Sequence, residues 1–143
     1  MKVIRLDNIS SDKNVEYINN LINKKTCLIG LFDKNCIHCQ NMKPNWELLK
    51  NNLKKKKCKS ALLEIDSSGI NKLTNYNLKN NINGFPSIMI YKNGNLVKEY
   101  NGNRTYEDLH SFFRPHMLAL NTKTQNNKKL KKNKTKRKTK TKN

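Results

Sequence analysis

Long apolar runs are missing from this 143-residue sequence. No stretch approaches the roughly 18–20 apolar residues that a transmembrane helix needs, so we expect no membrane-spanning segment. Residues 1–7 are too short and too charged to form a secretory signal peptide. We therefore expect an intracellular, cytoplasmic location for the chain.

Acidic residues are also scarce, with 10 Asp and Glu against 30 Lys and Arg, which gives a formal net charge of +20. Residues 121–143 carry 11 Lys or Arg, no acid and one aliphatic residue, Leu130. Because such a segment has almost nothing to bury, the sequence predicts one domain over residues 1–120 and a disordered Lys-rich tail over residues 121–143. We expect the chain to be a monomer.

The tail has two interpretations that the sequence leaves open. It is either a solvated extension or an electrostatic contact with nucleic acid, an anionic membrane face or an acidic partner. It has no aromatic residues for base stacking, so any binding of nucleic acid would be independent of base sequence.

Cysteine is limited to four positions, of which Cys36 and Cys39 stand three apart. At a helix start, residues at this spacing share a face, and their Cα atoms lie within reach of a disulfide. The unpaired N–H groups and the positive end of the helix dipole would stabilise a thiolate at Cys36. Cys36 is therefore the candidate nucleophile, and Cys39 would resolve the mixed disulfide that it forms.

The alternatives for this pair are a static disulfide and half of a zinc site. A zinc site needs about four ligands, and the Cys and His residues that remain outside this stretch form no paired ligand motif: Cys27, Cys58, His110 and His116. We predict no metal and no cofactor.

Strand and helix patterns of apolar residues alternate along the chain. They predict strands at residues 3–6, 26–32, 61–66, 88–91 and 96–100, and helices at residues 12–24, at residues 37–53, after Asp66 and after Thr105. Asn93-Gly94 is typical of a hairpin turn. The strand at 26–32 is apolar on both faces, as a covered parallel strand should be, and Cys27 within it is expected to be an inert core thiol. We expect Ile70, Leu73 and Tyr76 to face inward from the short helix.

The strand at residues 26–32, the Cys36-x-x-Cys39 motif and Pro44, five residues past the second cysteine, together resemble the thioredoxin superfamily. A second signature of that family is Gly84-Phe85-Pro86-Ser87, which opens the apolar strand at residues 88–91. The resemblance implies an α/β thioredoxin fold, with a mixed central β-sheet flanked by helices. It also implies a thiol–disulfide oxidoreductase that acts on protein thiols and disulfides.

His38 lies between the two cysteines, as a histidine does in the similar motif of protein disulfide isomerase, where thioredoxin has proline. A protonated His38 would stabilise the Cys36 thiolate and make the disulfide more oxidising, which predicts an oxidase-like or isomerase-like poise. Residues 99–105 resemble the stretch of the isomerase domain whose arginine tunes the second cysteine, so Arg104 is a candidate for that role. An incidental exposed histidine and an ordinary exposed arginine are the alternatives.

The same resemblance assigns substrate contacts to Phe85 and Pro86. It implies that Pro86 is cis and faces the dithiol, where a substrate strand could pair with the adjoining backbone. Ile37 stands where the isomerase motif has glycine, and its apolar side chain at the entrance favours an unfolded or hydrophobic substrate.

Two positions depart from the family pattern. Asn35 stands where the family usually has Trp, and Gly30 stands where thioredoxin and isomerase domains keep a buried acid. That acid accepts and returns the proton of the second cysteine, so Cys39 should react slowly unless water or another group substitutes. Asp33 is nearby, but we expect it at the mouth of the site rather than beneath it. The departures favour a second hypothesis, a non-catalytic binding module tethered by its basic tail to nucleic acid or a virion component.

Lys and Asn are abundant throughout the sequence. This bias resembles the proteins of large cytoplasmic DNA viruses or of A+T-rich eukaryotic parasites. A virus that assembles disulfides in the cytoplasm would reconcile an oxidising poise with the missing signal peptide, and would make the virion a second expected location.

Overall fold

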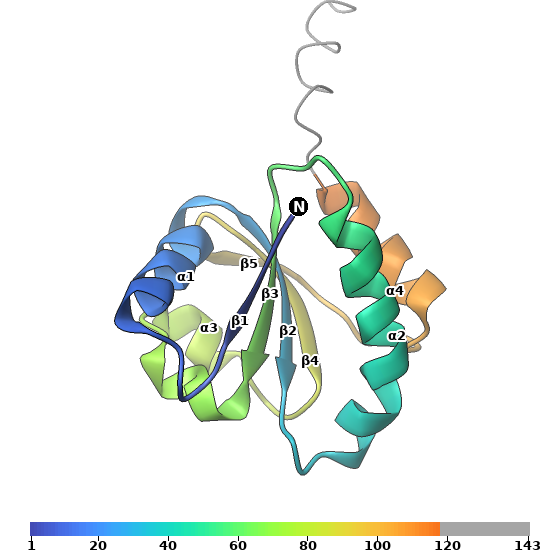
Figure 1. Ribbon diagram of the computed structural model, residues 1–143, viewed down its shortest axis with the longest axis horizontal. Helices are drawn as coiled ribbons and strands as arrows, with labels where there is room; N and C mark the ends of the chain where they lie inside the picture. Colours follow the sequence, from blue (N-terminus) through green and yellow to red (C-terminus); the bar gives the residue numbers. More distant parts are fainter. Residues whose placement is uncertain (118–143) are drawn as a thin grey trace, which may run out of the picture.

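The computed structural model describes residues 1–117, which form a five-stranded sheet with helices on both faces (Figure 1). The strands lie in the order β1-β3-β2-β4-β5. Neighbours β1, β3 and β2 are parallel, whereas β4 is antiparallel to both β2 and β5. The strands are β1 (Lys2–Leu6), β2 (Thr26–Phe32), β3 (Ala61–Asp66), β4 (Ser87–Lys92) and β5 (Asn95–Glu99). The predicted α/β fold with a mixed sheet is confirmed.

Two helices cover each face of the sheet. Helices α1 (Asp12–Lys24) and α3 (Tyr76–Asn80) lie on one side, and α2 (Ile37–Lys54) and α4 (Tyr106–Phe113) lie on the other (Figure 1). Short 3₁₀ helices follow β3 and α4, at Ser67–Lys72 and Arg114–His116. Within residues 1–117, no helix is long and apolar enough to cross a membrane.

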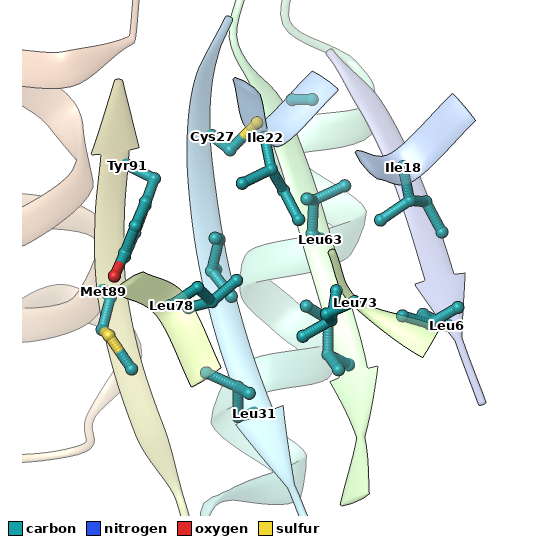
Figure 2. Close-up of a cluster of buried hydrophobic side chains, with 13 residues drawn as sticks. Leu6, Ile18, Ile22, Cys27, Leu31, Leu63, Leu73, Leu78, Met89 and Tyr91 are labelled. Carbon is teal, nitrogen blue, oxygen red and sulfur yellow. The ribbon is translucent and has the colours of Figure 1, made fainter. Parts of the chain in front are cut away.

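Strand β2 lies in the middle of the sheet and contributes side chains to the hydrophobic cores on both of its faces. Its alternating side chains Cys27, Ile29 and Leu31 join the core beneath α1 and α3 (Figure 2), whereas Leu28 joins the core beneath α2 and α4. Burial raises the pKa of the Cys27 thiol to about 12, as fits the predicted inert core thiol.

Local turn and cap residues act where the sequence places them. Asn93 and Gly94 adopt positive φ angles of 52° and 83° in the β4–β5 hairpin, as the predicted turn requires. The Thr105 side chain accepts a hydrogen bond from the Asp108 backbone N–H at the start of α4. The inward orientation expected for Tyr76 is wrong, because the chain leaves the 3₁₀ helix before this residue and α3 begins anew there, leaving Tyr76 77% exposed.

The predicted domain boundary at residue 120 and the Lys-rich tail at 121–143 lie outside the described residues.

A close contact between Gly30 and Trp46 joins α2 to the sheet. A Cβ atom at position 30 would lie 2.5 Å from Cη2 of Trp46, which is closer than two non-bonded carbon atoms approach. The indole is 2% exposed, and its Nε1–H donates to Oε1 of Glu64 in β3, 2.7 Å away. Gly30 and Glu64 are register partners on β2 and β3. Glycine on β2 therefore leaves room for the Trp46 ring, which donates its hydrogen bond to Glu64 on β3.

We predict that Gly30→Ala lowers the free energy of unfolding by about 1–3 kcal/mol, the usual cost of overpacking a core. The added methyl would force the indole to move. Urea unfolding followed by the fluorescence of Trp46, the only Trp in the sequence, measures the change. Gly84→Ala is the matched control and should be neutral or slightly stabilising, because a Cβ there has no atom within 4 Å. Equal stabilities of the two variants would contradict the packing argument.

Candidate active site

The turn between β2 and α2 is fixed by the side chain and the carbonyl of Asp33. Its Oδ1 accepts from the Asn35 N–H at 2.8 Å, and its backbone oxygen accepts from the Cys36 N–H at 3.2 Å. The Ser67 hydroxyl donates to Oδ2 at 2.7 Å. Hydrogen bonds from Ser67 and then from Asn35 hold the pKa of this carboxyl below its usual value.

Cys36 is the N-cap of α2, as the sequence predicts. Its backbone is extended, and its Sγ accepts a hydrogen bond from the Cys39 backbone N–H at 3.1 Å. The helix therefore begins at the dithiol, and one of its first-turn N–H groups, that of Cys39, points toward the Cys36 sulfur. Both cysteines are free thiols in the structure.

The two thiols differ sharply in exposure. Cys36 is partly exposed, whereas Cys39 is 6% exposed. Burial, and then the neighbouring Cys36 sulfur, raise the pKa of Cys39 to about 11 even though a backbone hydrogen bond from Asp33 opposes the shift. The more accessible sulfur is thus the one at the helix start.

Antiparallel pairing brings the second sequence signature to this turn. Ser87 at the start of β4 pairs with Leu31 near the end of β2, so the residues before Ser87 lie beside the β2–α2 turn. The Phe85–Pro86 peptide bond is cis, and the Cys36 thiol donates to the Phe85 carbonyl at 3.4 Å.

Ile37 and His38 occupy the first turn of α2 on the open side. Ile37 is 65% exposed, and His38 is also exposed. Within the described part of the chain, no hydrogen bond joins the His38 imidazole to either cysteine. The role assigned to His38 therefore stays a prediction.

Arg104 lines a hollow of about 260 Å³ that also exposes Pro86 and Tyr100. Within residues 1–117, its guanidinium forms no hydrogen bond or ion pair with Cys39. The structure places Arg104 beside the strand that follows the cis-proline, and its predicted effect on the second cysteine is not visible as a direct contact.

A second hollow, of about 520 Å³, lies beside Cys39. Its wall includes Asp33 at the end of β2, Trp46 of α2 and Glu64 of β3. Asp33 was expected at the mouth of the site, and its half-exposed position at the end of β2 fits that expectation.

Glu64 is a buried acid that the sequence analysis missed. Its carboxylate accepts from Arg5 Nη1 at 2.7 Å, Trp46 Nε1 at 2.7 Å and Lys50 Nζ at 3.1 Å. Burial alone would raise the pKa of this carboxyl, but its three hydrogen bonds outweigh burial and hold the pKa below the usual value. The signal was a lone carboxylate inside the apolar run 61–65, which is where a buried charge needs partners.

Metal-ligating side chains do not gather in the described part of the chain. Among residues 1–117, no group of three or more His, Cys, Asp or Glu residues is arranged to hold a metal ion.

Comparison with known proteins matches the sequence to the thioredoxin family over residues 8–115. Protein disulfide-isomerase A6 of Homo sapiens is 31% identical over 108 residues, which cover 75% of this chain and 23% of that protein. Protein disulfide-isomerase A4 of Rattus norvegicus is 30% identical over 101 residues, which cover 71% and 15%. The chain thus spans less than a quarter of the length of these relatives.

A solved structure agrees with the sequence matches. The first thioredoxin domain of mouse protein disulfide-isomerase A4 has a TM-score of 0.56 and 28% identity, covering 78% of this chain and 72% of that one. Similarity to these domains supports thiol–disulfide oxidoreductase chemistry in general. By its fold, its paired cysteines and its matched sequence, the chain belongs to the thioredoxin family.

Proposed function

We propose that the chain is a thiol–disulfide oxidoreductase that acts on protein disulfides through Cys36 and Cys39. The observation that carries this proposal is the position of the Cys36 sulfur. It lies at the start of α2, within hydrogen-bonding distance of the Cys39 N–H and of the carbonyl that precedes the cis-proline.

The reaction has two exchange steps. The Cys36 thiolate attacks one sulfur of a substrate disulfide, a mixed disulfide forms, and the other substrate sulfur leaves as a thiolate. The Cys39 thiolate then attacks the Cys36 sulfur, which releases the second substrate thiol and leaves the Cys36–Cys39 disulfide. In the oxidising direction the same steps run in reverse.

The surface around Cys36 fits an extended polypeptide better than an enclosed small molecule. Ile37 is exposed, and Phe85 and Pro86 are half-buried beside the dithiol. A substrate segment could pair with the backbone here, as extended peptides do at strand edges, while its apolar side chains contact Ile37.

Insulin reduction and the refolding of a scrambled disulfide protein test the proposal. We expect Cys36→Ser to abolish both reactions, because it removes the attacking sulfur. Cys39→Ser should still attack but should accumulate mixed disulfides with the substrate, visible by mass spectrometry. Wild-type protein that reduces, oxidises and rearranges no protein disulfide would contradict the proposal.

We predict that limiting iodoacetamide at neutral pH modifies Cys36 before the other three cysteines of the sequence. Burial and a pKa of about 11 disfavour Cys39, and burial with a pKa of about 12 disfavours Cys27. Peptide mapping measures the order. Cys58 is the internal comparison, since it is also partly exposed but does not lie at a helix start. Earlier modification of Cys39 would reverse the assigned roles.

We predict a reduction potential near the isomerase range of about −180 mV rather than the thioredoxin value of about −270 mV. The reason is His38, whose cation would stabilise the reduced dithiol. Equilibration in glutathione buffers measures the potential, and His38→Ala should make it more negative. His110→Ala is the matched control, because His110 lies on α4 and not in the turn of α2 that carries the two cysteines. A wild-type value at or below that of thioredoxin would show that other features outweigh the histidine.

A non-catalytic binding module is the second candidate function. The observation that favours it is the Trp46 ring, which fills the space that an acid at position 30 would need. On this hypothesis the exposed surface around Ile37 would bind a partner without disulfide exchange. Partner binding that survives Cys36→Ser, with no activity in the wild-type protein, would support it.

We further propose that residues 121–143 bind polyanions without contributing to the fold or to the chemistry. Eleven positive charges with no acid should release counterions from phosphates, so affinity should fall steeply with salt. We predict that deleting the segment leaves the melting temperature and insulin reduction almost unchanged but removes most retention on heparin at low salt. Undiminished retention would point instead to the exposed lysines at 54–57, and lost activity would place the domain boundary elsewhere.

A further inference from the structure

The buried thiol of Cys39 needs a group that removes its proton before it can attack, if the exchange reaction proposed above is correct. Two candidate positions are unsuited to that role. Position 30 has no side chain, and the Trp46 ring occupies its space. Glu64 is engaged by three donors, two of them cations, so its carboxylate is already neutralised.

Asp33 remains, and it contacts Cys39 through its backbone. It follows the last residue of β2, and its backbone N–H lies near enough to the Cys39 sulfur to favour the thiolate. Its carboxylate lines the same hollow as Cys39 and lies near enough to act on the ionisation of the thiol. The Ser67 hydroxyl and the Asn35 N–H hold this carboxylate in place.

We propose that the Asp33 carboxylate accepts the proton of Cys39 during the resolving step, directly or through water in the hollow beside Cys39. Asp33 is ionised at neutral pH, because its hydrogen bonds favour the charged form. It holds the proton only briefly and passes it to solvent, to which the hollow is open.

The step balances without a further reagent. The Cys39 S–H bond breaks and its proton moves to the Asp33 carboxylate. The Cys39 thiolate attacks the Cys36 sulfur of the mixed disulfide, the S–S bond to the substrate breaks, and the Cys36–Cys39 bond forms. The substrate leaves as a thiolate and takes up a proton from solvent, while Asp33 returns its proton to solvent.

Charges of both signs surround the hollow. Besides Asp33 its walls carry the cations Arg5, Lys34 and Lys43 and the acids Glu47, Glu64 and Asp66. Lys34 follows Asp33 directly and helps to keep it ionised. Cys36 is the other titratable group that acts on Cys39, and its sulfur opposes a second thiolate.

Asp33→Asn tests the proposal, because a neutral amide cannot accept the proton. Its Oδ1 can still accept from the Asn35 N–H, and its Nδ2 can donate to the Ser67 hydroxyl, so the turn should fold. Oxidised glutathione is the probe. After rapid mixing and acid quenching, mass spectrometry gives the lifetime of the mixed disulfide at Cys36. We expect this lifetime at pH 7 to increase about 10²-fold, the lower end of what a positioned general base contributes.

The sign of the change separates proton transfer from simple electrostatics. The charge of Asp33 raises the pKa of Cys39, so removing only a charge would ease ionisation and shorten the lifetime. We expect the lifetime to lengthen instead, and the difference from wild type to shrink toward pH 9, where hydroxide takes the proton. In a Cys36→Ser background, alkylation of Cys39 should by contrast become faster in Asp33→Asn, which reports the charge alone.

Glu47→Gln is the matched control, because it removes one negative charge from the same hollow. The Glu47 carboxylate bonds to Lys50, so the proposal gives it no part in the proton transfer. Its mixed disulfide should resolve as fast as in wild type. Asp33→Glu should restore part of the rate. A lifetime in Asp33→Asn equal to or shorter than that of wild type would overturn the proposal. If the wild-type protein exchanges with glutathione but does not reduce insulin, the proposed protein substrate is contradicted. The lifetime of the glutathione mixed disulfide would still test the role of Asp33.

Discussion

The packing of Trp46 against Gly30 is the contact on which the site depends. Helix α2 carries both cysteines at its start, and the indole anchors that helix to β2 by contact and to β3 through the bond to Glu64. Glu64 can be buried because Arg5 and Lys50 neutralise it; an unpaired charge there would be costly. One glycine, one ring and one paired carboxylate therefore set the distance of α2 from the sheet.

The environment makes the two thiols chemically different although they lie one turn apart. Cys36 faces the open surface and is bonded to backbone groups from both α2 and the loop before β4. Cys39 faces inward, where burial keeps its proton in place. Exchange with an outside disulfide needs an accessible thiolate, so the asymmetry makes Cys36 the sulfur that meets substrate in the proposed exchange.

The chain resembles a single domain of much longer disulfide isomerases, and its differences from the pattern of such domains cluster around the dithiol. Ile37 is exposed at the start of α2, and Gly30 leaves the space that the Trp46 indole fills. The indole stands where an acidic side chain at position 30 would lie, whereas the Asp33 and Glu64 carboxylates line the hollow beside Cys39.

Local sequence determined most of the fold and half of the site. The apolar run 26–32, the cap at Thr105 and the Asn93-Gly94 turn act through neighbouring residues, so their elements could be predicted. The inward orientation predicted for Tyr76 was wrong because two short helices replace one. Cys36 and Cys39 meet within one helical turn. Tertiary structure decided the rest: the antiparallel pairing of β4 with β2 brings Phe85 to Cys36, and the parallel register of β2 with β3 sets Glu64 opposite Gly30. Such contacts depend on strand order and register, which residue spacing along the chain does not specify.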